Sequence, residues 1–261
     1  MHRLLSVLFS ALVFTLFVAI GPVPAFRENI VAAWLFEEGT GKSVRDSTGN
    51  LDDGEINGSG KWVAGKFGQA LQFDGNTYIQ VPFSPKARVL NEGDFTVAAW
   101  LNTDLLATER GSYLAALQQM DGNGNGRTWL GIKGTDQTYS YLGNGDTFGP
   151  VPPVNEWYHV AVVVQENGAT DTLQVYFNGK IDGNAPSNRG IETCEGDFLI
   201  GAHKALSAVN FWEGLMDEFV IINKALSEAE INELMSSGAM GILSVESPGK
   251  LATTWGETKS N

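Results

Sequence analysis

Short apolar segments separated by polar turns make up most of the chain. Gly, Asn and Asp gather between them, as in Asp121-Gly-Asn-Gly-Asn-Gly126 and Gly143-Asn-Gly145-Asp146. Many short strands at this spacing, joined by turn residues, predict an all-β sandwich or barrel. Ten segments rich in Val, Ile, Trp, Tyr and Phe have strand character: Ile30–Phe36, Ala70–Phe73, Tyr78–Val81, Phe95–Leu101, Tyr113–Leu117, Thr128–Ile132, Trp157–Val164, Thr172–Phe177, Phe198–Ile200 and Phe211–Ile222.

Two of these segments also predict how they pair or pack. Asn178-Gly179 directly follows the segment Thr172–Phe177, and this dipeptide tolerates the positive φ angles of a type I′ turn, which predicts a β-hairpin. Trp157–Val164 is apolar on both alternating faces. Such a strand is expected to be covered on both sides, as a central strand of two packed sheets is.

One segment near the C-terminus departs from the strand pattern. Ser227 and Glu230 have the S-x-x-E spacing of a capping box, in which each side chain satisfies a backbone N–H at the start of a helix. Ile231 and Leu234 then follow at helical spacing, and Gly238 can supply a left-handed stop. The sequence therefore predicts one short helix after the last strand.

The first 25 residues have the pattern of a secretory signal peptide, with Arg3, an apolar run from Leu4 to Ile20 and a small-residue end at Ala25. An uncleaved membrane anchor is the alternative, because the apolar run is slightly long. We expect a secreted, periplasmic or cell-surface protein with one domain over residues 26–240. The stretch from Ser247 onward is polar, contains Pro and Gly and has no period, which predicts a flexible tail over residues 241–261; a sorting or attachment tag is the alternative.

Charge and cysteine content narrow the range of partners. The formal net charge of −13 argues against nucleic acid and anionic lipid as partners, since both need a basic surface. We expect no membrane insertion once the signal is cleaved. The single cysteine, Cys194, excludes an internal disulfide, so an exported domain would need some other reinforcement, such as a bound cation.

Read in order, seven segments resemble the bacterial laminin-G-like, concanavalin-A-like jelly-roll domains, which are related in shape to pentraxins. The resemblance implies an all-β fold of two curved antiparallel sheets with one short C-terminal helix. It also implies a structural calcium ion and a glycan- or protein-binding role. The matching segments begin with Ala33-Trp-Leu-Phe-Glu-Glu-Gly-Thr-Gly, Gly65-Lys-Phe-Gly-Gln-Ala-Leu-Gln-Phe-Asp-Gly75, Asp94-Phe-Thr-Val-Ala-Ala-Trp100 and Trp157-Tyr-His-Val-Ala161, and continue with Val175-Tyr-Phe-Asn-Gly179, Phe198-Leu-Ile-Gly201 and Gly214-Leu-Met-Asp-Glu-Phe-Val-Ile.

The resemblance implies calcium ligands in particular segments. The acidic residue of the Gly-x-x-Asp-Glu segment, Asp217, is the first candidate, and Glu37 is the next. Asp46 and Asp74 could converge with them, because the first strand lies near the last strand in this fold and calcium takes six to eight oxygen ligands. The alternative is that these residues are turn and cap residues, where Asp is favoured for its local hydrogen bonds.

Sugar binding needs flat aromatic faces beside polar groups. Aromatic residues near strand ends or loops are candidates, and the loop amides of Asn123 and Asn125 would add hydrogen bonds; the aromatic candidates are Trp129, Tyr139, Tyr141 and Trp212. In a sandwich most aromatic side chains lie in the core, which is the alternative for each of them. The loop with Asn123 and Asn125 is also open to two other interpretations, a plain hairpin loop and a second, weak calcium site.

Catalytic motifs are incomplete. Glu92-Gly-Asp94 and Glu195-Gly-Asp197 begin the E-x-D-x-x-E pattern of hydrolases on this fold, but Val97 and Ile200 occupy its last position. We therefore expect a non-catalytic carbohydrate-binding domain whose partner is an extracellular polysaccharide or glycoprotein. The alternatives are an adhesion or assembly module that binds a cell-surface protein, and a glycoside hydrolase or polysaccharide lyase.

Overall fold

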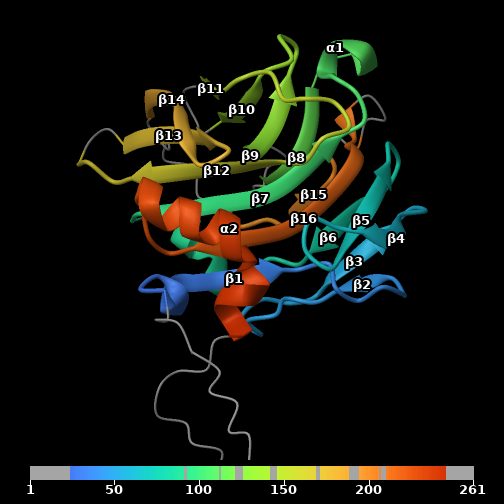
Figure 1. Ribbon diagram of the computed structural model, residues 1–261, viewed down its shortest axis with the longest axis horizontal. Coiled ribbons are helices and arrows are strands. Elements are labelled where there is room, and N and C mark those ends of the chain that lie inside the picture. Colours follow the sequence, from blue (N-terminus) through green and yellow to red (C-terminus); the bar gives the residue numbers. More distant parts are fainter. Residues whose placement is uncertain are drawn as a thin grey trace, which may run out of the picture.

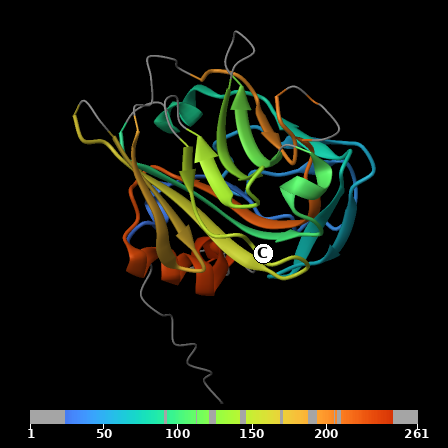
Figure 2. The same ribbon diagram turned by 90° about the horizontal axis from the view of Figure 1, so that it is seen from above.

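The protein forms two antiparallel β-sheets packed face to face (Figures 1 and 2). The computed structural model describes residues 24–90, 93–111, 113–120, 126–141, 146–168, 171–187, 194–204, 206 and 210–244. Within them each sheet contains eight strands, which confirms the expected jelly-roll sandwich. No helix of this part of the chain is long and apolar enough to cross a membrane.

The first sheet carries the C-terminal helix on its outer face. Its strands lie in the order β14-β13-β12-β7-β16-β5-β4, and β1 also pairs with β16. The bounds are β1 Ile30–Trp34, β4 Lys61–Ala64, β5 Gln69–Asp74, β7 Phe95–Thr103, β12 Tyr158–Gln165, β13 Asp171–Phe177, β14 Lys180–Ser187 and β16 Glu213–Ile222.

The second sheet has the strand order β11-β10-β9-β8-β15-β6-β3-β2. Its bounds are β2 Ser43–Val44, β3 Gly54–Asn57, β6 Tyr78–Val81, β8 Tyr113–Met120, β9 Gly126–Lys133, β10 Thr138–Tyr141, β11 Asp146–Phe148 and β15 Phe198–Ile200. Four helical segments complete the described chain: η1 Arg27–Asn29, η2 Pro85–Leu90, α1 Ala107–Arg110 and α2 Glu228–Ser244.

The apolar residues form two separate cores. The larger core fills the space between the sheets and contains Trp34, Phe73 and Trp212, all of which are fully buried. The smaller core lies between α2 and the first sheet, where Ile231 and Leu234 of the helix pack beside Ala98 and Val220 of the strands (Figure 1). Strand β12 supplies residues to both cores, so it is covered on both faces, as its apolar pattern predicts.

The hairpin and the helix start follow their sequence signals. Asn178 and Gly179 have φ angles of 47° and 78° and join β13 to β14, as a type I′ turn requires. At the start of α2, the Ser227 N–H donates to Glu230 Oε2 at 3.0 Å, and the Glu230 N–H donates to Ser227 Oγ at 3.4 Å.

Gly238 interrupts α2 without ending it. The glycine has a φ of 67° and lies at a kink, after which helical residues continue to Ser244. Ile242, in this second part, is 1% exposed and belongs to the smaller core. Residues 241–244 therefore lie in the helix, whereas the expected tail begins at residue 241; residues 245–261 lie outside the described part of the chain.

Candidate functional site

Three acidic residues meet on the outer face of the first sheet, beside α2. Glu37 follows β1, and Asp217 and Glu218 lie next to each other in β16. The register between β16 and β7 shifts between Asp217 and Val220, and Glu218 has a φ of 55°. This β-bulge interrupts the alternation of the strand and turns both carboxylates toward Glu37, the loop between β4 and β5, and α2.

Asp217 is fully buried and only partly satisfied. Its Oδ2 atom accepts a hydrogen bond from the N–H of Phe67 at 2.9 Å, whereas Oδ1 is buried and has no hydrogen-bond partner. Burial raises the pKa of Asp217 to about 8, and the negative charges of Glu218 and Glu37 add to the shift. An ionised carboxylate at this position therefore needs a compensating positive charge.

Glu218 connects the bulge to the helix. Its carboxylate accepts hydrogen bonds from the N–H groups of Ala239 and Met240, which directly follow the kink in α2. Burial raises the pKa of Glu218 to about 7, these backbone hydrogen bonds oppose the shift, and the charge of Glu37 increases it. Glu218 thereby satisfies backbone donors at the start of the second helical part.

The loop between β4 and β5 closes the site from the other side. Glu37 Oε1 accepts a hydrogen bond from the N–H of Gln69 at 3.1 Å. A Cβ atom on Gly68 would lie 2.1 Å from Glu37 Oε1, and one on Gly65 would lie 2.7 Å from Asp217 Oδ2. The carbonyl oxygen of Gln69, 2.4 Å from a Cβ on Gly65, excludes a side chain there, and the φ of 49° favours glycine at position 68, so the loop backbone lies close to both carboxylates.

The acidic cluster of Glu37, Asp217 and Glu218 fits a cation in its charge but offers few side-chain ligands. Among the described residues, none of the three carboxylates forms an ion pair with a basic side chain. In the same part of the chain, no three Asp, Glu, His or Cys side chains are arranged so that they could hold one metal ion. A calcium ion at Asp217 Oδ1 would therefore take much of its shell from backbone carbonyls or water, both of which calcium accepts.

Asp46 and Asp74, the two other expected calcium ligands, lie directly before turns: Asp46 forms an isolated β-bridge with Trp34, and Asp74 is the last residue of β5. Asp46 is 2% exposed, and its oxygens accept hydrogen bonds from four backbone N–H groups and one hydroxyl within residues 33–51. Asp74 Oδ1 accepts from the Asn76 N–H at 3.1 Å and from Thr77 Oγ1 at 2.8 Å. Each carboxylate stabilises its own turn. Among the described residues, neither forms a hydrogen bond with a residue of the acidic cluster.

The expected sugar-stacking residues are buried where the structure describes their side chains. Trp212 is fully buried in the core between the sheets, so its ring is not available to a ligand. Tyr139 is 5% exposed and its ring centroid lies 6.4 Å from that of Phe148. Trp129 lies in β9 and Tyr141 in β10, but their side chains are outside the described part, as are Asn123 and Asn125 entirely.

Two further residues near the acidic cluster are inaccessible to a substrate. His159 is 2% exposed, and burial lowers its pKa to about 3, so the imidazole is neutral at physiological pH. Its ring lies edge-on to Trp100, which pairs with Asp217 across β7 and β16. Trp100 itself is 7% exposed.

Glu218, Gly65 and Gly68 were not expected from the sequence to contribute to the site. The signal for Glu218 is its place directly after Asp217 in an otherwise apolar strand, because two adjacent residues of a regular strand cannot share a face. The signal for the glycines is their spacing in Gly65-Lys-Phe-Gly68, a tight loop between two strands.

Solved structures with the same fold include sugar-binding proteins. Domain 4 of AbnA, an extracellular arabinanase of Geobacillus stearothermophilus solved with arabinotriose, matches with a TM-score of 0.58 and 21% identity, over 79% of this chain and 98% of that one. A Trypanosoma rangeli sialidase matches with a TM-score of 0.65 and 18% identity; 84% of this chain is covered, and the match spans about a third (34%) of the sialidase. The binding domain of Paraclostridial Mosquitocidal Protein 1 matches with a TM-score of 0.60 and 16% identity, over 81% of this chain and 53% of that one.

With sequence identities of 16–21%, these three matches show a shared fold and no shared function. No curated protein matches the chain in sequence. The sequence profile of the concanavalin A-like lectin/glucanases superfamily matches residues 73–232, which is more than half of the chain. The strand order, the two facing sheets and the helix on the outer face agree with this assignment. The chain therefore belongs to the concanavalin A-like lectin/glucanase superfamily.

Proposed function

We propose that this chain is a secreted or cell-surface, non-catalytic carbohydrate-binding domain that is stabilised by calcium. The observation that carries the proposal is the match to 98% of arabinanase domain 4, a domain that was solved with an oligosaccharide bound. The sialidase match adds a second protein of carbohydrate chemistry with the same fold. The partner of this chain would then be an extracellular polysaccharide or glycoprotein.

The position of the acidic cluster supports a non-catalytic role. A glycosidase needs two carboxyl groups on either side of an accessible glycosidic bond, about 5–10 Å apart. Asp217 and Glu218 are 0% and 4% exposed and are enclosed by the loop between β4 and β5 and by α2. A sugar chain cannot reach them in this arrangement, so a structural role fits them better than acid–base chemistry.

Calcium suits the acidic cluster because the buried charges have no basic partner among the described residues. Asp217 would supply the unpartnered Oδ1 atom, and Glu37 a second carboxylate. When bound, the ion would neutralise the buried charge, whereas the protein's own contribution is to hold these carboxylates against the glycine loop and α2.

The calcium part of the proposal predicts a melting temperature that depends on calcium. At a free calcium concentration about a hundred times the Kd, binding adds about 2.7 kcal/mol, or about 5–10 °C for a domain of this size. We expect Asp217→Asn to abolish this shift and the exposed control Asp52→Asn to keep it. Equal melting temperatures of the unsubstituted protein in calcium and in chelator would contradict a calcium site.

The carbohydrate part is tested with a broad array of glycans and polysaccharides, probed in calcium and again in chelator. We expect binding to one coherent class of glycan, weaker in chelator because the site then loses its support. A blank array with a folded, calcium-responsive protein would contradict carbohydrate binding while leaving the calcium site intact. The search would then turn to cell-surface proteins as partners.

A further inference from the structure

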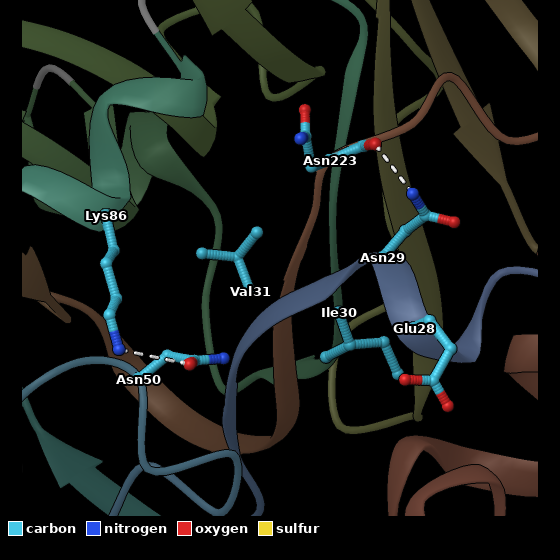
Figure 3. Close-up of a pocket in the computed structure, with 7 residues that line it drawn as sticks. All are labelled: Glu28, Asn29, Ile30, Val31, Asn50, Lys86 and Asn223. Carbon is cyan, nitrogen blue, oxygen red and sulfur yellow. Dashed lines mark hydrogen bonds between the residues drawn. The ribbon is translucent and has the colours of Figure 1, made fainter.

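A shallow pocket of about 280 Å³ lies at the other end of β1 from the acidic cluster (Figure 3). Four segments that are distant in sequence line it: residues 28–31 at the end of η1 and the start of β1, Asn50 in a turn after β2, Lys86 of η2, and Asn223 just after β16. None of the aromatic residues singled out in the sequence lines this pocket.

Hydrogen bonds fix the backbone around the pocket. The N–H of Asn223 donates to the carbonyl of Asn29 at 2.8 Å, and Asn29 Nδ2 donates to the carbonyl of Asn223 at 3.2 Å. On the other side, the carboxylate of Asp46 accepts the N–H of Asn50 at 2.9 Å and so holds the turn that carries this residue. The pocket is therefore largely formed before any ligand arrives, which lowers the ordering cost of binding.

The rim of the pocket offers both hydrogen-bond donors and acceptors. Lys86 donates to Asn50 Oδ1 at 3.3 Å, and no described contact uses the side-chain N–H groups of Asn50. The side chain of Asn223 and the Oδ1 atom of Asn29 have no other hydrogen bond among the described contacts. Since an amide group both donates and accepts, this rim suits hydroxyl groups, which do the same.

The remaining lining determines the charge and shape of the ligand. Figure 3 shows Lys86 and Glu28 on opposite sides of the pocket, with Val31 between them. Lys86 is the only basic side chain of the lining, and Glu28 lies 3.8 Å from the Arg27 guanidinium, so the pocket does not gather the several basic groups that a phosphate, a sulfate or an acidic sugar would need. The side chain of Ile30 is 6% exposed and packs in the smaller core, so the aliphatic surface that the pocket can offer to the C–H face of a ring comes mainly from the half-buried Val31.

We infer that this pocket binds one uncharged sugar unit of a glycan chain, mainly through hydrogen bonds to its hydroxyl groups. The volume is just below the ~300–1,000 Å³ of pockets that hold drug-sized ligands, which limits the occupant to about one sugar ring. The inference rests on the proposed carbohydrate-binding function and assigns that function to a particular place.

The test measures binding of arabinotriose and of a panel of neutral pentose and hexose trisaccharides to the full mature chain, with sialic acid as the acidic comparison. Binding is followed through the ¹⁵N side-chain amide signals of the protein. We expect the signals of Asn29, Asn50 and Asn223 to shift with at least one neutral sugar and not with sialic acid. The double variant Asn50→Ala/Asn223→Ala should bind that sugar about tenfold more weakly.

Two further variants separate the outcomes. Lys86→Met keeps the aliphatic stem and should also weaken binding, whereas Asn76→Ala, on an exposed turn outside the pocket, should not. Neutral sugar binding that is unchanged in the pocket variants would overturn the pocket assignment and leave the carbohydrate function standing. Binding of sialic acid alone would overturn the inferred ligand chemistry, and no binding of any sugar would overturn both the pocket and the proposed function.

Discussion

At the scale of single residues, Asp217 and Glu218 interrupt the alternation of side chains along β16. Both lie in a strand that is otherwise mostly apolar, and the positive φ of Glu218 allows both carboxylates to turn to one side. The cost of burying them is visible in their pKa values, about 8 and about 7. Because the pKa values of these groups differ between the folded and the unfolded state, the free energy of unfolding depends on pH.

Without calcium, we expect the protein to become less stable as the pH rises from about 4 to about 8. Over this range the unfolded chain releases the proton of Asp217 near its usual pKa of 3.8, whereas the folded protein holds it until about pH 8, so the unfolded state binds fewer protons. The loss is on the order of a few kcal/mol. Melting temperatures in chelator at pH 5 and pH 8 measure it.

The matched variant for this pH dependence is Asp217→Asn, which keeps an acceptor for the Phe67 N–H but cannot ionise. Its melting temperature in chelator should fall less between pH 5 and pH 8 than that of the unsubstituted protein. Identical pH profiles for the two proteins would show that Asp217 does not titrate in this way.

The sequence was a partial guide to single residues. It identified Asp217 and Glu37 as neighbours, because the resemblance places both segments beside each other. Glu218 was missed, because its position depends on a bulge in the pairing of β16 with β7 and not on its own sequence. Trp212 was expected at a ligand site and lies in the core, because the sequence next to a strand end does not reveal which way a ring points.

At the scale of elements, different side chains accept hydrogen bonds from the backbone of α2 at its start and after its kink. The capping box of Ser227 and Glu230 satisfies the first turn, and the carboxylate of Glu218 satisfies the donors after the kink at Gly238. Both parts of the helix cover the smaller core, through Ile231 and Leu234 before the kink and Ala239 and Ile242 after it. Loss of either set of hydrogen bonds would expose backbone donors that have no other partner within the helix.

We expect Ser227→Ala to lower the free energy of unfolding by about 1 kcal/mol, because it removes the acceptor for the Glu230 N–H. For a domain of this size the melting temperature should fall by about 2–4 °C. Ser236→Ala is the control, since Ser236 lies on an exposed part of the same helix and bonds only to the Glu233 carbonyl. An equal loss in both variants would show that the capping box contributes nothing specific.

All ten strands expected from the apolar pattern are present, most with ends within a few residues of those expected. Six further strands lie outside these ten segments. The strand β14 was expected only as the second arm of the hairpin after Asn178-Gly179, whereas β2, β3, β4, β10 and β11 were not among the expected segments. These five strands are two to four residues long, so their extended form depends on neighbouring strands. A pattern within one segment cannot reveal a pairing with a distant segment.

At the scale of the whole molecule, β16 is the strand on which the first sheet depends. It pairs with β7, β5 and β1, which come from residues 95–103, 69–74 and 30–34. It also carries Asp217 and Glu218, and therefore joins the sheet, the acidic cluster and α2. Removing it leaves the inner edges of its three partner strands without hydrogen-bond partners.

We expect a chain that ends after Phe211 to show no cooperative thermal unfolding, because it lacks β16 and α2. A chain that ends after Ser244 keeps every described element and should melt at the temperature of the full chain. Circular dichroism during heating measures both. A cooperative transition in the shorter chain would show that the remaining strands can form a stable sheet by themselves.

The late position of β16 in the sequence affects how the molecule is made. A ribosome or an export channel delivers β1 first, but its partner strand emerges only after nearly two hundred further residues. Until then β1, β5 and β7 have apolar faces and open edges that can pair with other chains. We therefore expect the nascent protein to need holding factors that keep it apart from its copies until its last strand arrives, and to fold slowly because its key contacts are distant along the chain.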